Sequence, residues 1–305
     1  MAADVALQEP SRTASAAGRD PNRRKRFGSG LAAIPFLWLV AFLLGPLGIL
    51  LAWSFQAPTS QIKLGPASTA AYGSILGVSS YWNLILWTIA TAAIVGLLAV
   101  VLAYPIAYLI AFVAGRHRYM LLAIAFVPFL TSYVLRIFAW RLILGENGLL
   151  NQGLMSIGLI HSPLTALLYS RLTVIIVLTY VWIPWAALPI FVRLDSIQRP
   201  LFEAAADLGV SPLRTVRRVV LPISLPGVYT AFFLVFIPTL GDFATAAYVG
   251  GSKGLMVGNI IQSFLSNLNL PAGSVMTAIL LAVAVVLMLI AVRLMRVRSV
   301  TDVQL

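Results

Sequence analysis

Six long apolar segments constrain the fold of this 305-residue chain more than any other feature. A helix needs about 20 largely apolar residues to cross the roughly 30 Å hydrocarbon core of a bilayer, because each helical residue rises about 1.5 Å. Apolar residues make up 60% of the chain and charged residues only 10%, which excludes an ordinary soluble domain. The sequence therefore predicts an all-α polytopic membrane protein with six transmembrane helices. The expected spans are residues 31–53, 82–113, 119–144, 172–192, 227–248 and 273–294.

Lysine and arginine lie almost entirely on one side of the predicted spans. Sixteen are on the side of the N-terminal tail, two fall within the third span, and only Lys63, Arg171 and Lys253 are on the other side. Because basic residues favour the cytoplasmic side of a membrane, we expect both termini and the connection of residues 193–226 in the cytoplasm. Topology thus accounts for the net charge of +12, and we expect no nucleic-acid partner.

Polar segments at the two ends frame a single membrane domain. Residues 1–30 are rich in Ala and Ser and end in a basic cluster, which predicts a disordered cytoplasmic tail. We expect the membrane domain over residues 31–298 and a short cytoplasmic tail over residues 299–305. The first apolar segment is longer than the core of a secretory signal, and no convincing small-residue cleavage site ends it. We therefore expect it to be a transmembrane span.

The patterns of common catalytic and cofactor sites are missing from the sequence. There is no cysteine, so neither a disulfide nor a thiolate site is possible. His117 and His161 are isolated, which makes a metal site or a general base improbable. No GxxxxGK[ST] loop occurs, and the glycine-rich residues 250–254 lack its spacing. We expect a chain that is not an enzyme and that binds no metal or cofactor itself.

The connection of residues 193–226 has the pattern of two helices joined by a sharp turn. Pro200 suits the first position of one helix, the alanines that follow favour it, and Gly209 can adopt the left-handed conformation that ends it. Ser211 suits the cap of a second helix that starts at Pro212. The basic residues of this second helix are Arg214, Arg217 and Arg218.

This connection resembles the EAA loop of permease subunits of binding-protein-dependent ATP-binding-cassette (ABC) importers. In that family the first helix of the loop docks into a cleft of a cytoplasmic ATPase. The resemblance implies that Glu203 pairs with a basic residue of the ATPase, that small alanines allow close approach, and that Gly209 allows the turn. An ordinary amphipathic loop is the alternative. The residues that we expect to dock the ATPase are Glu203, Ala204, Ala205, Asp207, Gly209, Leu221 and Pro222.

Segments outside this connection are similar to permeases of the spermidine/putrescine importer family, over about residues 31–295. They include residues 132–140, 241–243 and 258–260. The resemblance implies the fold of type I ABC importer permeases (MetI-like) and the role of the first of two permease subunits. It also implies a second homologous permease, an ATPase dimer that uses ATP and Mg, and a periplasmic or lipid-anchored binding protein.

The sequence leaves alternatives open for both the substrate and the energy source. Related permeases serve ferric iron, thiamine, phosphonates and opines as well as polyamines, and each of these stays possible. An ATP-independent carrier or channel, whose cytoplasmic loop has no docking role, is the rival from another class. No internal repeat or inverted symmetry is evident in the sequence, which disfavours a carrier built from two like halves.

Charged and aromatic residues in the predicted spans are candidates for a translocation pathway. An unpaired carboxylate is costly inside a membrane, so Asp242, placed in the outer half of the fifth span, should face water or a partner. It could attract a dication such as putrescine, or pair with Arg136 or Arg141. The further candidates are Tyr180, Trp182, Trp185 and Glu146. The three aromatic rings could stack on an alkylammonium chain or simply pack against other side chains. The Glu146 carboxylate could attract substrate or be a solvated loop residue.

Overall fold

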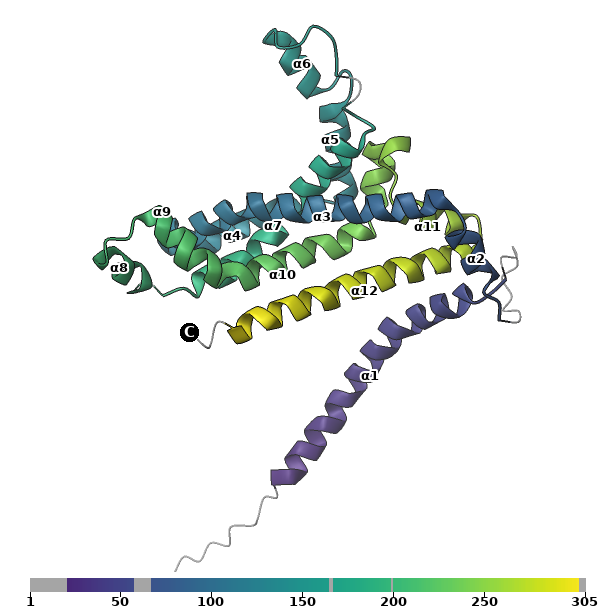
Figure 1. Cartoon of the computed structure of the whole chain (residues 1–305), viewed down its shortest axis with the longest axis horizontal. Helices are drawn as coiled ribbons and strands as arrows, with labels where there is room; N and C mark the ends of the chain where they lie inside the picture. The colour runs from purple at the N-terminus through teal and green to yellow at the C-terminus, as the bar shows by residue number, and fades with distance from the viewer. Residues whose placement is uncertain (1–20, 58–66, 165–166, 199, 302–305) are drawn as a thin grey trace, which may run out of the picture. The chain divides into compact units, whose positions relative to one another are not determined.

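The computed structural model describes residues 21–57, 67–164, 167–198 and 200–301, and among these every regular element is a helix (Figure 1). Residues 1–20 and 302–305 of the predicted tails, with Lys63, lie outside the described residues. The chain divides into two units, residues 1–49 and 50–305, each described here by itself. The all-α class expected from the apolar segments is confirmed.

Helix α1 (Pro21–Ser54) carries the first predicted span. It begins at Pro21, inside the segment of residues 1–30 that we predicted to be a cytoplasmic tail. Proline is favourable at the first helical position, and arginine and lysine are good helix formers, which explains the early start. The part Pro35–Ser54 is long and apolar enough to cross a membrane.

Three long helices pack together as the core of the second unit: α3 (Ser79–Tyr108), α7 (Arg171–Asp195) and α10 (Leu221–Leu240). Small residues let their backbones approach. A Cβ added at Gly227 of α10 would lie 2.7 Å from the carbonyl oxygen of Pro189 in α7, and one at Gly96 of α3 would lie 2.9 Å from the Phe232 ring of α10. The predicted second and fourth spans are confirmed as Ser79–Val113 and Arg171–Asp195.

Helix α12 (Leu270–Thr301) carries the sixth predicted span and packs with two short helices, α2 (Ala70–Leu76) and α11 (Val257–Ser266). Their shared core contains Ala71, Val275 and Met276. The Val257 amide donates a buried hydrogen bond of 3.0 Å to Thr88 Oγ1, which ties the start of α11 to α3.

The third predicted span is a broken helix, which corrects the single helix expected over residues 119–144. After a π turn, η1 (Leu109–Val113), and a 3-10 turn, η2 (Gly115–His117), the chain forms α4 (Arg118–Phe126) and the 3-10 turn η3 (Val127–Leu130). It then bends by 82° into α5 (Tyr133–Leu144), which α6 (Leu149–Ser156) follows. Pro128 lies in η3, where it removes a backbone donor and favours such a break.

The fifth predicted span also differs from expectation. The helical stretch starts at Pro212 with α9 (Pro212–Thr215), passes through the π turn η4 (Val216–Val220), and continues as α10 to Leu240. Residues 241–248 therefore lie beyond it, because the chain turns at Gly241. Two short turns follow, η5 (Ala246–Gly250) and η6 (Ser252–Gly254). The described residues hold five helices long and apolar enough to cross a membrane, or six spans when the bent pair counts as one.

Candidate functional site

The predicted docking segment forms a short helix closed by a left-handed glycine. Helix α8 (Pro200–Asp207) starts at the expected proline, and Gly209 has a φ of +70°. The Gly209 amide donates to the Ala206 carbonyl at 2.8 Å, and the Val210 amide donates to the Ala205 carbonyl at 3.0 Å. This pair of hydrogen bonds is a Schellman motif, which satisfies the last carbonyls of the helix. The turn that we predicted at Gly209 is confirmed.

The second helix of the loop departs from expectation in two ways. Ser211 occupies the cap position, but its side chain makes no capping hydrogen bond, so the predicted side-chain cap is wrong. The Thr215 amide instead bonds the Ser211 carbonyl at 2.9 Å. The helix is also not short, because it runs on into α10. Leu221 and Pro222 thus form the first turn of α10, and the predicted docking set is divided between two helices.

Helix α8 presents a polar and small-residue face to solvent and packs with its opposite face. Glu203, Ala204 and Asp207 are exposed, whereas Ala205 is buried. Leu208, just after the helix, has 82% of its surface exposed. This exposed face is available to a partner of matching shape.

An aromatic contact joins α8 to the end of α3. The Phe202 ring meets the Phe112 ring edge to face, with centroids 4.9 Å apart, and Phe112 lies 4.9 Å from Tyr108. These three rings form an aromatic ladder that links the loop to a core helix. The contact between Phe202 and Phe112 could not be predicted from the sequence, since nothing in it pairs residues so far apart in the chain.

The base of the loop is also held by an ion pair. Arg118, which starts α4, donates through Nη1 to Asp195 Oδ1 at 2.5 Å, and Asp195 ends α7. Tyr119 Oη donates to the other carboxylate oxygen at 3.4 Å. Among the described residues this is the one ion pair. It fixes the point where α7 passes into the loop, and the sequence analysis did not find it.

Asp242 lies after α10 and caps the next helical segment. Its Oδ1 accepts hydrogen bonds from the amides of Thr245 at 3.0 Å and Ala246 at 3.4 Å. Tyr133 Oη, from α5, donates to Oδ2 at 2.5 Å, and Thr245 Oγ1 donates to Oδ2 at 3.2 Å. The expected position within the fifth span is corrected, because α10 ends two residues earlier. The carboxylate ties α5 to the segment after α10.

Neither Arg136 nor Arg141 pairs with Asp242, so the predicted ion pair is not observed. The Arg136 guanidinium carbon lies 4.4 Å from the Phe129 ring centroid, and that of Arg141 lies 5.9 Å from the ring of Tyr169. Both cations are thus placed over aromatic faces, which attract positive charge.

The remaining pathway candidates occupy three different places. Trp185 joins Phe126 and Phe129 in a cluster of rings with centroids 5.6 to 5.8 Å apart, beside Arg136. Tyr180 meets Trp140 edge to face at 5.3 Å. Trp182 has a buried Nε1 with no hydrogen-bond partner, and Glu146 is exposed in the turn after α5. The structure therefore brings Trp185 and Arg136 together, with Asp242 linked to them through Tyr133, which lies 5.7 Å from the Arg136 guanidinium.

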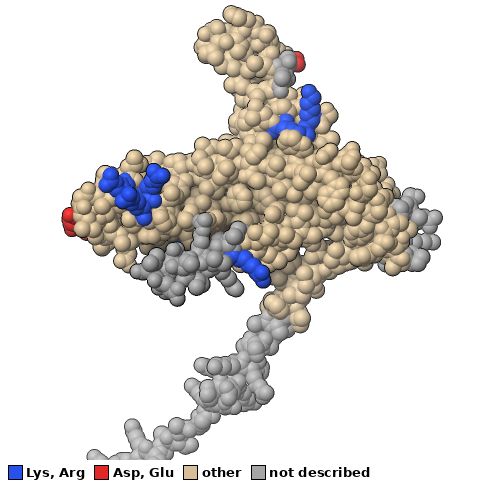
Figure 2. Space-filling view, in the orientation of Figure 1, with Lys and Arg blue, Asp and Glu red and all other residues tan. Residues whose placement is uncertain are grey.

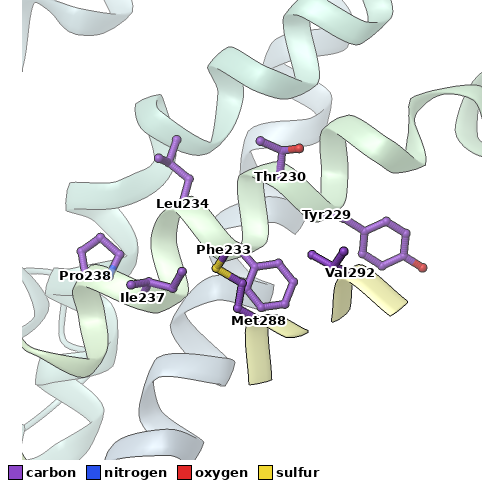
Figure 3. A pocket seen from close by; sticks show the side chains of 8 residues that line it. All are labelled: Tyr229, Thr230, Phe233, Leu234, Ile237, Pro238, Met288 and Val292. Carbon is purple, nitrogen blue, oxygen red and sulfur yellow. The ribbon is translucent and has the colours of Figure 1, made fainter. Parts of the chain in front are cut away.

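An apolar hollow of about 440 Å³ lies between α10 and α12 (Figure 3). No charged side chain is among its described lining residues. It is lined by Tyr229, Thr230, Phe233, Leu234, Ile237, Pro238, Met288 and Val292. No group of three His, Cys, Asp or Glu residues that could hold a metal ion occurs in the described ranges.

A helical bundle of membrane-spanning length, with an exposed helix and turn between two spans, defines a class of protein, the multi-pass α-helical membrane proteins. Within that class, the chain belongs to the family of inner membrane components of binding-protein-dependent transport systems, whose family model matches residues 103–298.

Curated relatives match this chain over most of their length. The spermidine/putrescine transport system permease protein PotB of Haemophilus influenzae is 32% identical over 254 residues, which cover 82% of this chain and 87% of the relative. PotB of Escherichia coli K12 is 32% identical, with 83% and 92% covered. The inner membrane ABC transporter permease protein YdcU of the same organism is 30% identical, with 75% and 77% covered.

A crystal structure of a bacterial ABC transporter that imports the acidic polysaccharide alginate contains a chain of the same fold. The TM-score is 0.71 at 17% identity, with 90% of this chain and 96% of that chain covered. A second structure of an alginate ABC transporter, in complex with a periplasmic protein bound to an alginate pentasaccharide, gives 0.69 at 16% identity, with 88% and 93% covered. These likenesses concern the fold.

Proposed function

We propose that this ABC importer permease forms half of the translocation pathway for a polyamine such as spermidine or putrescine. The observation that carries the proposal is the 32% identity to PotB permeases over 82% of this chain and 87% of the Haemophilus relative. Ferric iron, thiamine, phosphonates and opines are the competing substrates within the same class.

In the proposal, α8 is the element that transmits the effect of ATP hydrolysis to the membrane helices. In the proposed assembly, the exposed face with Glu203 docks on a cytoplasmic ATPase, and the Schellman turn at Gly209 holds the angle between α8 and the helix that follows. The aromatic ladder from Phe202 to α3 supports this role, because it offers a packed contact through which motion of α8 can reach a core helix. The Arg118–Asp195 ion pair keeps the base of the loop in place.

The partners of the proposed importer are a second homologous permease, an ATPase dimer that uses ATP and Mg, and an extracytoplasmic binding protein. The positive-inside pattern of the sequence supports cytoplasmic termini in a bacterial inner membrane. This chain binds no cofactor in the proposal, since ATP is hydrolysed by the partner. Spans that rock between two arrangements expose the pathway to each side in turn.

A pathway role for the cluster around Tyr133 is part of the proposal. Asp242 lies in this cluster, beside the ring of Tyr133, and a dication would be attracted to its carboxylate. The Trp185 and Phe129 rings offer faces for alkylammonium groups. In the structure Arg136 occupies one of these faces.

Uptake of labelled spermidine and putrescine tests the proposal. Cells that lack their own polyamine importers would receive the full set of transporter genes, with unlabelled thiamine and 2-aminoethylphosphonate as competitors. We expect uptake that only polyamines suppress. No uptake of labelled polyamine above cells with an empty vector, together with uptake of labelled thiamine or 2-aminoethylphosphonate, would assign a different substrate.

Reversal of charge at the docking helix tests the coupling. We expect Glu203→Lys to abolish uptake while the protein still inserts, because the side chain is exposed on α8. Gln152→Lys is the control, because it also adds positive charge at an exposed helical position, on α6, to which no role is assigned. Full uptake by Glu203→Lys with a normal ATPase complex would contradict the docking role.

A further inference from the structure

Three arginines line a polar hollow at the start of the fifth span. The hollow has a volume of about 640 Å³, and its lining residues are Ser211, Leu213, Arg214, Arg217 and Arg218. Figure 2 shows Lys and Arg atoms gathered over the end of the molecule where Figure 1 places α9. The proposed docking role of the loop does not require these side chains, because the predicted docking residues of α8 precede Gly209.

The three arginines have no partner among the described residues. None forms an ion pair, and none donates a hydrogen bond to another side chain. They are exposed, whereas Thr215 and Val220 on the same stretch are buried against the bundle. Three unpaired cations so close together repel one another, and an anion between them would relieve that repulsion.

The depth of the hollow points to the phosphate layer of a membrane. Helix α10 has 20 residues, enough for the roughly 30 Å hydrocarbon core. At about 1.5 Å for each residue, positions 214–218 lie roughly 4 to 10 Å before its start. A headgroup layer is about 5 to 8 Å thick on each side of the hydrocarbon. Leu221 and Ile223, at the start of α10, are 39% and 42% exposed, as expected for side chains that meet lipid tails.

We propose that this hollow binds the phosphate of an anionic phospholipid in the cytoplasmic leaflet, given the orientation proposed above. A guanidinium donates two parallel hydrogen bonds to one phosphate, and it is more weakly hydrated than an ammonium. Arg214, Arg217 and Arg218 together surround the phosphodiester. The bound lipid holds the start of α10 at the membrane surface, immediately after the loop. The lipid site is independent of the substrate, so the proposal stands whichever small molecule the importer carries.

Two other anions could bind in this hollow, a free phosphate ion and an acidic surface of the ATPase. A free phosphate lacks the tails that keep a lipid at this depth. An acidic surface of the ATPase would have to reach past α8 to positions next to the hydrocarbon. The experiment distinguishes all three.

Lipid titration of the full-length purified protein in detergent tests the proposal. The probes are dioctanoyl phosphatidylglycerol, dioctanoyl phosphatidylcholine and inorganic phosphate, with binding followed by native mass spectrometry. We expect saturable binding of phosphatidylglycerol that is weakened roughly thirtyfold in Arg217→Gln/Arg218→Gln, about fivefold for each arginine near an anionic surface. Phosphatidylcholine should bind more weakly to the wild type.

The matched control is Arg116→Gln/Arg293→Gln, which removes two exposed arginines from the same predicted side of the membrane. We expect less than a twofold change in this control. A second variant, Arg217→Lys/Arg218→Lys, keeps the charge but loses the paired donors, and it should bind with intermediate affinity even if the glutamine variant folds poorly.

Three results would overturn the proposal. Equal weakening in the test and control variants would indicate only general electrostatic attraction. Displacement of the lipid by an equal concentration of inorganic phosphate would assign a free-anion site. Loss of the ATPase from the assembled transporter in Arg217→Gln/Arg218→Gln, with lipid binding intact, would assign the arginines to the protein partner.

Discussion

Gly209 is the residue on which the shape of the proposed coupling loop depends most directly. Its φ of +70° lies in the left-handed region, yet a Cβ built there would meet no atom within 4 Å. A side chain at position 209 is therefore disfavoured by the left-handed backbone conformation and not by lack of space. A side chain costs about 1 to 2 kcal/mol in this conformation, and asparagine tolerates it better than alanine does.

We expect Gly209→Ala to lower uptake roughly tenfold at an unchanged protein level, with Gly209→Asn less affected. Uptake and membrane content are measured together. Gly158 provides a matched control, since its φ is +72° and the space around it is equally open. If Gly158→Ala lowered uptake as much, backbone strain in general, rather than the coupling loop, would explain the loss.

Asp242 combines a structural contact with a possible pathway role, and one substitution separates them. Asparagine keeps an oxygen that can accept from the Thr245 and Ala246 amides, but it removes the negative charge. We expect Asp242→Asn to lower polyamine uptake roughly tenfold, about the effect of one hydrogen bond to a charged group, with a much smaller loss of protein. Equal losses of uptake and protein in membrane fractions would assign the residue to folding alone.

At the scale of elements, α8 is packed against the end of α3, although most of its residues are exposed. Phe202 points back to the end of α3, opposite the proposed docking face, so α8 is packed on one side and open on the other. A helix held in this way can move only together with what it packs against. The aromatic ladder is thus the element-level link between the ATPase and the core helices in the proposed mechanism.

We expect Phe202→Ala to uncouple the assembled importer. Loss of an aromatic pair costs about 1 kcal/mol, which shifts the population of a two-state element roughly fivefold. Uptake should fall by that factor while ATP hydrolysis continues. Leu201→Ala, a truncation at the exposed neighbouring position, is the control. A parallel fall in hydrolysis and uptake would instead mean that the ATPase no longer docks.

The spans that could be predicted from the sequence are those whose hydrophobicity coincides with one continuous helical stretch, namely the first, second, fourth and sixth. Hydropathy continues across the bend at residues 131–132 and past Gly241, so it could not reveal where those helices end. The Gly209 turn was predictable because its cause is local. The partners of Asp242 and Phe202 were not, because they come from segments about 90 or more residues away in the chain.

At the scale of the whole molecule, this chain is one part of a transporter in the proposed function. The chain belongs to a family of inner membrane components of binding-protein-dependent systems. In the proposed function, movement of substrate against a gradient requires the partner ATPase. This requirement separates the proposal from its rival, a carrier or channel that works alone.

We expect the purified chain, reconstituted alone in liposomes, to give no flux of labelled putrescine above that of empty liposomes. Addition of the second permease, the ATPase and the binding protein should give flux that depends on ATP. Flux down a gradient through this chain alone would support the carrier or channel. The measurement is a filtration assay at matched lipid composition.

The π turn η4 has a consequence for the evolution and engineering of this chain. A π turn has hydrogen bonds between residues five apart rather than four, so it accommodates one residue more than an α turn does. Removal of one residue within Val216–Val220 could therefore restore a regular α-helix without changing the register of α10 against α3 and α7. The same deletion would leave α8 and α9 close to their present direction, because the wide turn already takes up the extra residue. Loss of a residue from the regular part of α10 would instead rotate the loop about the helix axis by roughly 100°, the angle of one α-helical residue. The π turn is thus the place in this stretch where the chain can lose one residue at the least cost to the direction of the loop.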